Sequence, residues 1–352
     1  MKEPVMAIVV LKLPVVKRKT EERPKKCPYC TGITFQRWGP VNKPVKDVRV
    51  RNVKVYRYRC CHCKRTFRHY PEGNTSADQT KRLRLFVVVL WTLGLSYRAS
   101  SLILSGLKVL VSFMTVWRDV QEEAQQIKKC NHWKPVRVLG LDGASVLGWG
   151  EKQPVLIAVD IGTGQPLTVG YVNEYDPQAV RRWLAPLVQR HGITVIVTDD
   201  LFSYKVVAQK LQLEHQVCQF HVRRWVGKTL KQLQETIPKE WLWILDEIRQ
   251  LLEVLPFDGS KTLYALWKQL PGRRSLPSQA RSALELLRDL LLRLSEHWQY
   301  YCTFQSEPEI PWTNNATERA IGRMKMRARM VRGYKSWSGM EAGLLLAGSY
   351  AG

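Results

Sequence analysis

The stretch VRVLGLDG, residues 136–143, decides the fold of the central part of this 352-residue chain. Its apolar residues alternate from Val136 onward, which predicts a β-strand that ends at Asp142. A strand of this kind would place a carboxylate at the edge of a sheet. The alternative is a hairpin turn at Asp142 and Gly143, because an Asp-Gly pair favours such turns.

Regular elements continue downstream of this stretch. Asp176 and Pro177 open an amphipathic helix that stops at Gly192, and a further helix lies between the last two expected strands. These alternating strands and helices predict a mixed α/β sheet, in which ligands favour the carboxyl ends of strands. The additional segments expected to be strands are 154–160, 167–172, 193–198 and 216–220.

A second carboxylate ends the strand at 193–198. The doubled Asp199-Asp200 leaves its position uncertain by one residue, and Asp199 is preferred because it directly follows the strand. Either residue could instead cap the next helix. Asp160 also ends an expected strand, but there a turn is the better interpretation.

A third carboxylate, Glu318, lies in TNNATER, residues 313–319, at the start of a basic helix. A capping box of Asn315 with Glu318 explains this pattern on local grounds. Lys325 follows seven residues later on the same helical face, and Arg329 follows one turn further. A carboxylate with cations stacked behind it fits a metal ligand next to a phosphate backbone.

Five of the eight cysteines lie within residues 27–63. Two C-x2-C pairs predict a closed tetrahedral zinc site in a structural role, with the ligands Cys27, Cys30, Cys60 and Cys63. Cys61 or His62 could substitute as a ligand, and ordinary buried thiols or a redox pair are the alternatives. Between the pairs, Val48–Tyr58 alternates valines with basic residues, as expected for a small β-ribbon.

Residues 80–118 have the spacing of three short helices. Gly94 is a plausible helix stop, and Ser96 and Ser112 are plausible caps for the second and third helices. A helix-turn-helix would direct Arg118 of the last helix towards the DNA major groove. A plain helical linker domain is the alternative, because this spacing is a weak signal.

The chain carries a formal net charge of +25, which is concentrated in two segments. Residues 1–75 hold 19 basic and 5 acidic side chains, and residues 318–335 hold 7 and 1. This charge indicates nucleic acid as the leading partner. A membrane is not expected, because the longest apolar stretch, Leu85–Leu95, is about half the length of a spanning helix. The run Val5–Val10 is too short for a signal peptide, so a soluble cytoplasmic protein is expected.

Taken together, these motifs resemble the DDE transposases of bacterial insertion sequences. The resemblance rests on Leu-Asp142-Gly, Thr-Asp199-Asp and TNNATE with Lys325, in that order, behind a zinc ribbon and a helix-turn-helix. Cys218-Gln-Phe-His221 is similar to the C-x2-H motif of the Mutator-like group. The resemblance implies a ribonuclease H-like α/β fold with a helical insertion between Asp199 and Glu318.

The resemblance also implies a chemistry. Asp142, Asp199 and Glu318 would hold two Mg²⁺ ions, which Mn²⁺ can replace, for DNA cleavage and 3′-hydroxyl strand transfer. Basic side chains of the same helix would neutralise phosphates of double-stranded DNA, and His221 would support a ligand. A homodimer or higher oligomer near the bacterial nucleoid is expected. These basic side chains are Arg323, Lys325, Arg327 and Arg329.

The expected organisation has five parts. They are a basic zinc ribbon at 1–74, a helix-turn-helix at 75–130, a catalytic core at 131–225, a helical insertion at 226–305 and a final core helix at 306–352. Two other functions remain open. One is a non-catalytic DNA-binding protein derived from a transposase, and the other is a ribonuclease H-like nuclease without strand transfer.

Overall fold

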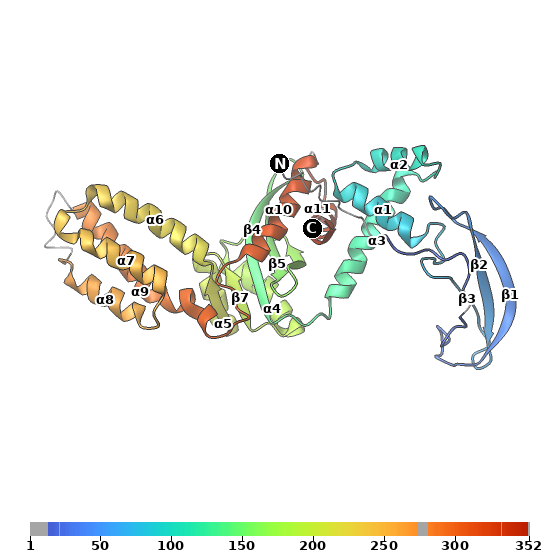
Figure 1. The fold of residues 1–352 in the computed structure, drawn as a ribbon, viewed down its shortest axis with the longest axis horizontal. Helices are drawn as coiled ribbons and strands as arrows, with labels where there is room; N and C mark the ends of the chain where they lie inside the picture. The colour runs from blue at the N-terminus through green and yellow to red at the C-terminus, as the bar shows by residue number, and fades with distance from the viewer. Residues whose placement is uncertain (1–12, 21, 273–280, 332, 351–352) are drawn as a thin grey trace, which may run out of the picture. The chain divides into compact units, whose positions relative to one another are not determined.

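The computed structural model describes residues 13–20, 22–272, 281–331 and 333–350 (Figure 1). The chain forms two compact units, Met1–Gln126 and Ile127–Tyr350. The run Val5–Val10 lies outside the described residues. Within the described ranges, no helix has both the length and the apolar composition needed to cross a membrane.

The first unit contains a three-stranded antiparallel sheet in the order β1-β2-β3. Its side chains alternate in burial, since Val53 and Val55 are buried while Lys54 between them is exposed. This alternation confirms the expected ribbon, although the strand begins at Asn52 and not at Val48. The strands are β1 (Phe35–Pro44), β2 (Asn52–Cys60) and β3 (Thr66–His69).

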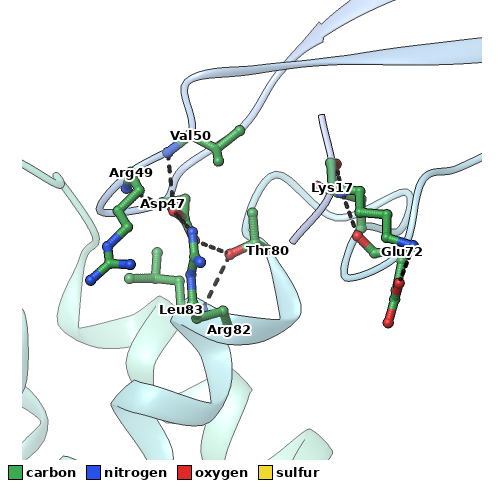
Figure 2. A network of polar contacts seen from close by, with 9 residues as sticks. Lys17, Asp47, Arg49, Val50, Glu72, Thr80, Arg82 and Leu83 are labelled. Carbon is green, nitrogen blue, oxygen red and sulfur yellow. Dashed lines mark hydrogen bonds and ion pairs between the residues drawn. The ribbon is translucent and has the colours of Figure 1, made fainter. Parts of the chain in front are cut away.

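The late start of β2 has a local cause at Asp47, whose side chain is fully buried. Its carboxylate accepts hydrogen bonds from the backbone N–H groups of Arg49 and Val50, which bend the chain before β2. It also accepts from the hydroxyl of Thr80 and the guanidinium of Arg82 (Figure 2). Asp47 therefore fastens the ribbon to the first helix.

Three helices complete the first unit, and each follows a hydroxyl residue. Thr80, Ser96 and Ser112 each accept a hydrogen bond from the backbone N–H three residues later, which confirms the expected helix starts. Gly94 follows the first helix with a φ of 113°, a left-handed conformation that favours glycine. The helices are α1 (Lys81–Thr92), α2 (Tyr97–Gly106) and α3 (Phe113–Asn131).

The second unit is built on a five-stranded mixed sheet with the order β6-β5-β4-β7-β8. The pairs β6-β5 and β5-β4 are antiparallel, whereas β4-β7 and β7-β8 are parallel. Three antiparallel strands followed by two parallel ones form the ribonuclease H-like arrangement, which confirms the expected fold class. The strands are β4 (Val138–Gly148), β5 (Glu151–Asp160), β6 (Gln165–Gly170), β7 (Val195–Thr198) and β8 (Glu214–Val217).

The observed strand boundaries differ from those expected by up to several residues, and two of the differences bear on the site. β4 does not end at Asp142, because Asp142 pairs with Ile157 and the hairpin with β5 continues to Gly148. The proposed Asp-Gly turn is therefore wrong as well. The last strand ends at Val217, and Phe220 already lies in the following helix, since Cys218 is the helix N-cap.

Helices cover both faces of this sheet. On one face, Leu184 of α4 and Val207 of α5 pack in the same core as Leu139 and Leu156 of the sheet. On the other face, helices α10 and α11 pack against the alternate side chains of β4, β5 and β6. The four helices are α4 (Pro177–His191), α5 (Phe202–Leu211), α10 (Asn315–Met330) and α11 (Trp337–Tyr350).

Between β8 and α10, the chain forms the expected helical insertion. Its apolar stripes pack into one leucine-rich core that includes the buried Trp298 and Tyr301. Figure 1 shows these yellow and orange helices side by side as a bundle. The helices are α6 (Gln219–Thr236), α7 (Leu242–Val254), α8 (Gly259–Gln269) and α9 (Arg281–Cys302), with short 3-10 turns at Lys239–Trp241 and Thr303–Gln305.

Candidate active site

Asp142 lies on β4 immediately beyond the part of that strand that pairs with β7. The β4–β7 pairing covers Val138 to Gly140, so the chain leaves the parallel part of the sheet before Asp142. Burial, together with the charges of Asp199 and Glu174, raises the pKa of Asp142 to about 7, although Lys325 lowers it. Asp142 thus lies in an acidic surrounding that disfavours its own ionisation.

The adjacent residues Asp199 and Asp200 have different partners. Asp199 follows β7 directly, and its Oδ1 lies 2.9 Å from Nδ1 of His221. Asp200 is ion-paired on both sides, with Lys205 Nζ at 2.5 Å and Arg293 Nη2 at 2.6 Å. Its side chain is only 4% exposed, so Asp200 holds the insertion helix α9 against α5. The structure brings Asp199, and not Asp200, next to Asp142.

Glu318 lies on α10, close to His221 and therefore to Asp199. Asn314, the residue before this helix, donates from Nδ2 to the carbonyl of Leu141 at 3.0 Å. A Cβ on Gly140 would overlap the hydroxyl of Thr317, so glycine allows α10 to lie directly against β4. The alternative of a capping box with Asn315 is wrong, because the helix begins after Asn314 and Glu318 falls one position too late. The start of α10 instead packs on the strand that carries Asp142.

His221 lies between two of the carboxylates. Its Nδ1 is 2.9 Å from Asp199 Oδ1 and 3.8 Å from Glu318 Oε1. Hydrogen bonding to Asp199 and to Cys218 raises the pKa of His221 to about 10, so the imidazole is protonated at neutral pH. The ligand atoms of Cys218, His221 and Glu318 all lie within 4.8 Å of one another. The sequence placed the C-x2-H motif after Asp199 but did not predict that it joins Asp199 to Glu318.

The expected phosphate-binding cations of α10 differ in exposure. Lys325 and Arg329 are exposed, and Lys325 lines a pocket of about 500 Å³ beside Gly143. Arg323 donates to the carbonyls of Gly348 and Gly164, and the buried Arg327 is 3% exposed. Of these four side chains, only the exposed pair is therefore presented to a DNA backbone.

Arg118, the remaining expected DNA contact, lies on α3 in the first unit. Its side chain is exposed, whereas Asp119 beside it is buried and accepts hydrogen bonds from Gln79 and Arg84. Those bonds attach α3 to the start of α1. Arg118 thus projects from a helix that is held in place on its other side.

The four expected zinc ligands cluster in the first unit. Sγ of Cys27 lies 3.8 Å from that of Cys63, and Sγ of Cys30 lies 3.6 Å from that of Cys60. All four sulfur atoms are within 4.8 Å of one another, and the cluster includes neither Cys61 nor His62. Backbone N–H groups of Cys63 and His62 lower the pKa of the Cys60 thiol to about 6, whereas burial and the neighbouring thiols raise the pKa of Cys63 to about 11, so without a metal Cys60 is the more readily ionised of the two. The cluster fits a zinc ribbon.

Part of the second unit is similar to a known protein family. Residues 171–342 match the sequence model described as Transposase IS66 family. The match identifies this part of the chain as that of an insertion-sequence transposase. The transposase match contains Asp199 and Glu318, whereas Asp142 and the first unit lie before it. It names the IS66 family and not the Mutator-like group suggested by the C-x2-H spacing. A comparison with curated proteins finds no match.

One acidic residue near the site was missed in the sequence. Glu174 lies between β6 and α4, and its carboxylate occupies the position that a Cβ of Gly143 would take. The available signal was its place shortly after a strand and two residues before the helix cap Asp176. That signal is weak, because many acidic residues occur before helices without any function.

Proposed function

We propose that this transposase cleaves DNA at the ends of its element and joins the resulting 3′-hydroxyl to target DNA, with Asp142, Asp199 and Glu318 as the catalytic residues. The observation that carries the proposal is their convergence near the carboxyl end of β7, from β4, from the residue after β7 and from α10. The three lie far apart in sequence, so only the fold brings them together. Carboxylate oxygens are the ligands that Mg²⁺ prefers.

The residues fit a divalent cation. Among the described residues, the buried Oε1 of Glu318 has no hydrogen-bond partner, and Oδ1 of Asp199 lies 2.9 Å from Nδ1 of His221. Bound cations would activate the attacking oxygen and stabilise charge on the phosphate. His221 is held beside both carboxylates as a positive charge, and it orients them. Asn314 and Gly140 hold the helix that carries Glu318 at the required place.

The remaining parts of the chain serve DNA binding in this proposal. Cys27, Cys30, Cys60 and Cys63 bind a structural Zn²⁺ ion, which stabilises the basic ribbon at 1–74. The helix-turn-helix at 75–130 contacts the element end through Arg118, and the exposed Lys325 and Arg329 contact phosphates near the site. Because two element ends must be joined, at least two copies of the chain act together in the bacterial cytoplasm.

The proposal is tested with single substitutions in the full chain. Asp142→Asn, Asp199→Asn and Glu318→Gln are each expected to reduce Mg²⁺-dependent cleavage roughly 10³-fold or more. The substrate is a plasmid that carries the gene with its flanking DNA, and binding of that DNA should change by only a few-fold. Joining of a labelled 3′ end measures strand transfer in the same reaction.

Asp200→Asn is the matched control, because it changes the adjacent aspartate. It is expected to lower thermal stability while the folded enzyme keeps its cleavage rate. Unchanged cleavage in Asp142→Asn would overturn the assignment of the catalytic residues. Cleavage without joining would indicate a nuclease, and binding without cleavage by the unsubstituted chain would indicate a DNA-binding protein derived from a transposase.

A further inference from the structure

Glu174 is brought to the acidic site by strand register. Gly143 on β4 pairs with Leu156 on β5, and Leu156 pairs with Gly170, the last residue of β6. The chain that leaves β6 therefore begins its path to α4 in line with Gly143. Within that path, the side chain of Asn173 accepts a hydrogen bond from the N–H of Tyr175, which turns the backbone around Glu174.

Two contacts then hold the carboxylate in place. Gly143 has no side chain, and any Cβ there would overlap the carboxyl group of Glu174. From the other side, the hydroxyl of Tyr204 donates a hydrogen bond to Oε2 of Glu174 at 2.8 Å. Tyr204 is fully buried near the start of α5, so this donor has little freedom to move. Glu174 is thus restrained immediately beside Asp142.

The charge around Glu174 differs from that around a structural carboxylate. Asp200, the structural example in this fold, has Lys205 and Arg293 within 2.6 Å. Glu174 has no ion pair among the described side chains, and its nearest charged neighbours include Asp142. Nor does it cap α4, because Asp176 does so. The fold thus holds two carboxylates close together, and the cation that acts on Asp142, Lys325, forms no ion pair with Glu174.

The surroundings of Glu174 are open to a ligand. Glu174 and Lys325 line the same pocket of about 500 Å³, at whose edge Gly143 follows Asp142. A phosphate group in this pocket would have Lys325 and the carboxylate of Glu174 on the pocket wall. This is the arrangement in which a divalent cation bridges carboxylates and phosphate.

We propose that Glu174 is a fourth carboxylate of the divalent-cation site, placed next to Asp142 and positioned by Tyr204. The inference rests on the proposed function, because it extends the site formed by Asp142, Asp199 and Glu318. In this arrangement the side chain of Glu174 contacts the cation, whereas Tyr204 acts through Glu174. The absence of a side chain at Gly143 leaves room for the carboxyl group of Glu174.

The experiment measures cation binding directly, with Mn²⁺ as the probe and the full zinc-loaded chain at pH 8. Isothermal titration calorimetry gives the Mn²⁺ dissociation constant, and thermal melting is recorded with and without Mn²⁺. Glu174→Gln is expected to weaken Mn²⁺ binding about 10-fold or more. It should also raise the melting temperature of the cation-free protein, because one of several like charges is removed.

Three further variants separate the possible explanations. Tyr204→Phe keeps the ring but loses the donor, and it should weaken Mn²⁺ binding several-fold. Glu214→Gln removes an exposed glutamate at the start of β8 and should leave both measurements unchanged. Glu174→Asp keeps the charge but shortens the side chain. It should bind Mn²⁺ more weakly than the unsubstituted chain, and it serves as the test if Glu174→Gln does not fold.

Asp142→Asn distinguishes failure of this inference from failure of the proposed function. If Asp142→Asn abolishes Mn²⁺ binding and Glu174→Gln does not weaken it, Glu174 is not a ligand and the acidic site stands. If neither variant weakens binding, the proposed site itself is wrong. A Glu174→Gln protein that melts earlier and binds Mn²⁺ normally would make Glu174 a structural partner of Tyr204 only.

Discussion

At the scale of single residues, neighbouring carboxylates in this chain have opposite environments. Asp200 is buried between two cations, whereas Asp199 faces His221 and the charge of Asp142. The side chains are chemically identical, so the difference comes only from the direction in which the backbone presents them after β7. Asp47 has an environment like that of Asp200, because it is buried and hydrogen-bond donors surround its carboxylate.

Asp47 leads to a prediction about acid stability. Burial alone would raise its pKa, but hydrogen bonds from Arg82, Thr80 and Arg49 outweigh burial and lower it. A carboxyl group with a lowered pKa stabilises the folded state above its unfolded pKa, near 4, and loses this contribution as the pH falls through the folded value. Asp47→Asn should therefore destabilise the first unit by about 1–3 kcal/mol at pH 7.

Thermal melts between pH 7 and pH 2 measure this effect. The difference between the Asp47→Asn variant and the unsubstituted chain should shrink below about pH 4 as Asp47 becomes protonated. Asp258→Asn, at an exposed aspartate that makes no capping bond, is the matched control. A difference that stays constant down to pH 2 would contradict the role assigned to the charge of Asp47.

At the scale of elements, the ribbon β1–β3 has the weakest core of its own. Its buried side chains form two small groups, one around Val53 and one around Tyr58 and the cysteines of the proposed zinc site. Small sheets with so little apolar burial depend on additional restraints such as a metal. The ribbon is also attached to α1 through Asp47, so loss of the metal should affect the ribbon before the helices.

Removal of zinc tests this dependence. Treatment with a strong chelator is expected to release one Zn²⁺ per chain and to open residues 22–75 to trypsin, while Ile127–Tyr350 stays resistant. Cys60→Ser should lose zinc in the same way, and Cys61→Ser should retain it, since Cys61 lies outside the cluster. Metal analysis and peptide mapping give the two readouts. Equal zinc contents in the two variants would contradict the ligand set.

At the scale of the whole molecule, the net charge of +25 is concentrated in the ribbon and in the segment that contains α10. On the ribbon, Lys54, Arg65 and Arg68 are exposed. On α10, part of the basic charge is used inside the fold, since Arg323 holds the end of α11. Net charge therefore overstates the number of side chains that can contact DNA, and the ribbon should contribute most of the electrostatic binding.

Salt dependence measures that contribution. The dissociation constant for DNA should rise by about 10³-fold or more between 50 and 200 mM salt, because each neutralised phosphate releases counterions. Replacing Lys54, Arg65 and Arg68 together with glutamine should lower the slope of log affinity against log salt by about 2–3. The triple substitution of Lys231, Lys239 and Lys261 on the helical insertion is the matched control. Equal slopes in the two triple variants would contradict a ribbon-centred interface.

The sequence by itself determined the local elements of this protein. Caps such as Ser96 and Asp176, the stop at Gly192 and the C-x2-C pairs depend on residues close together in the sequence, so they could be predicted without the fold. The order of strands and helices also predicted the mixed sheet. The three acidic candidates were found because each lies beside a recognisable element, and the resemblance to transposases joined them.

Tertiary structure decided everything that depends on register and on approach between distant segments. β4 extends to Gly148 because β5 pairs with it, and no local pattern reports that partner. The burial of Asp200 between cations depends on Lys205 and on Arg293 of a distant helix. Glu174 reaches Asp142 because β5 pairs with both β4 and β6, which brings the end of β6 into line with Gly143. Short-range chemistry sets the elements, whereas the position of a charge in the site depends on how those elements pack.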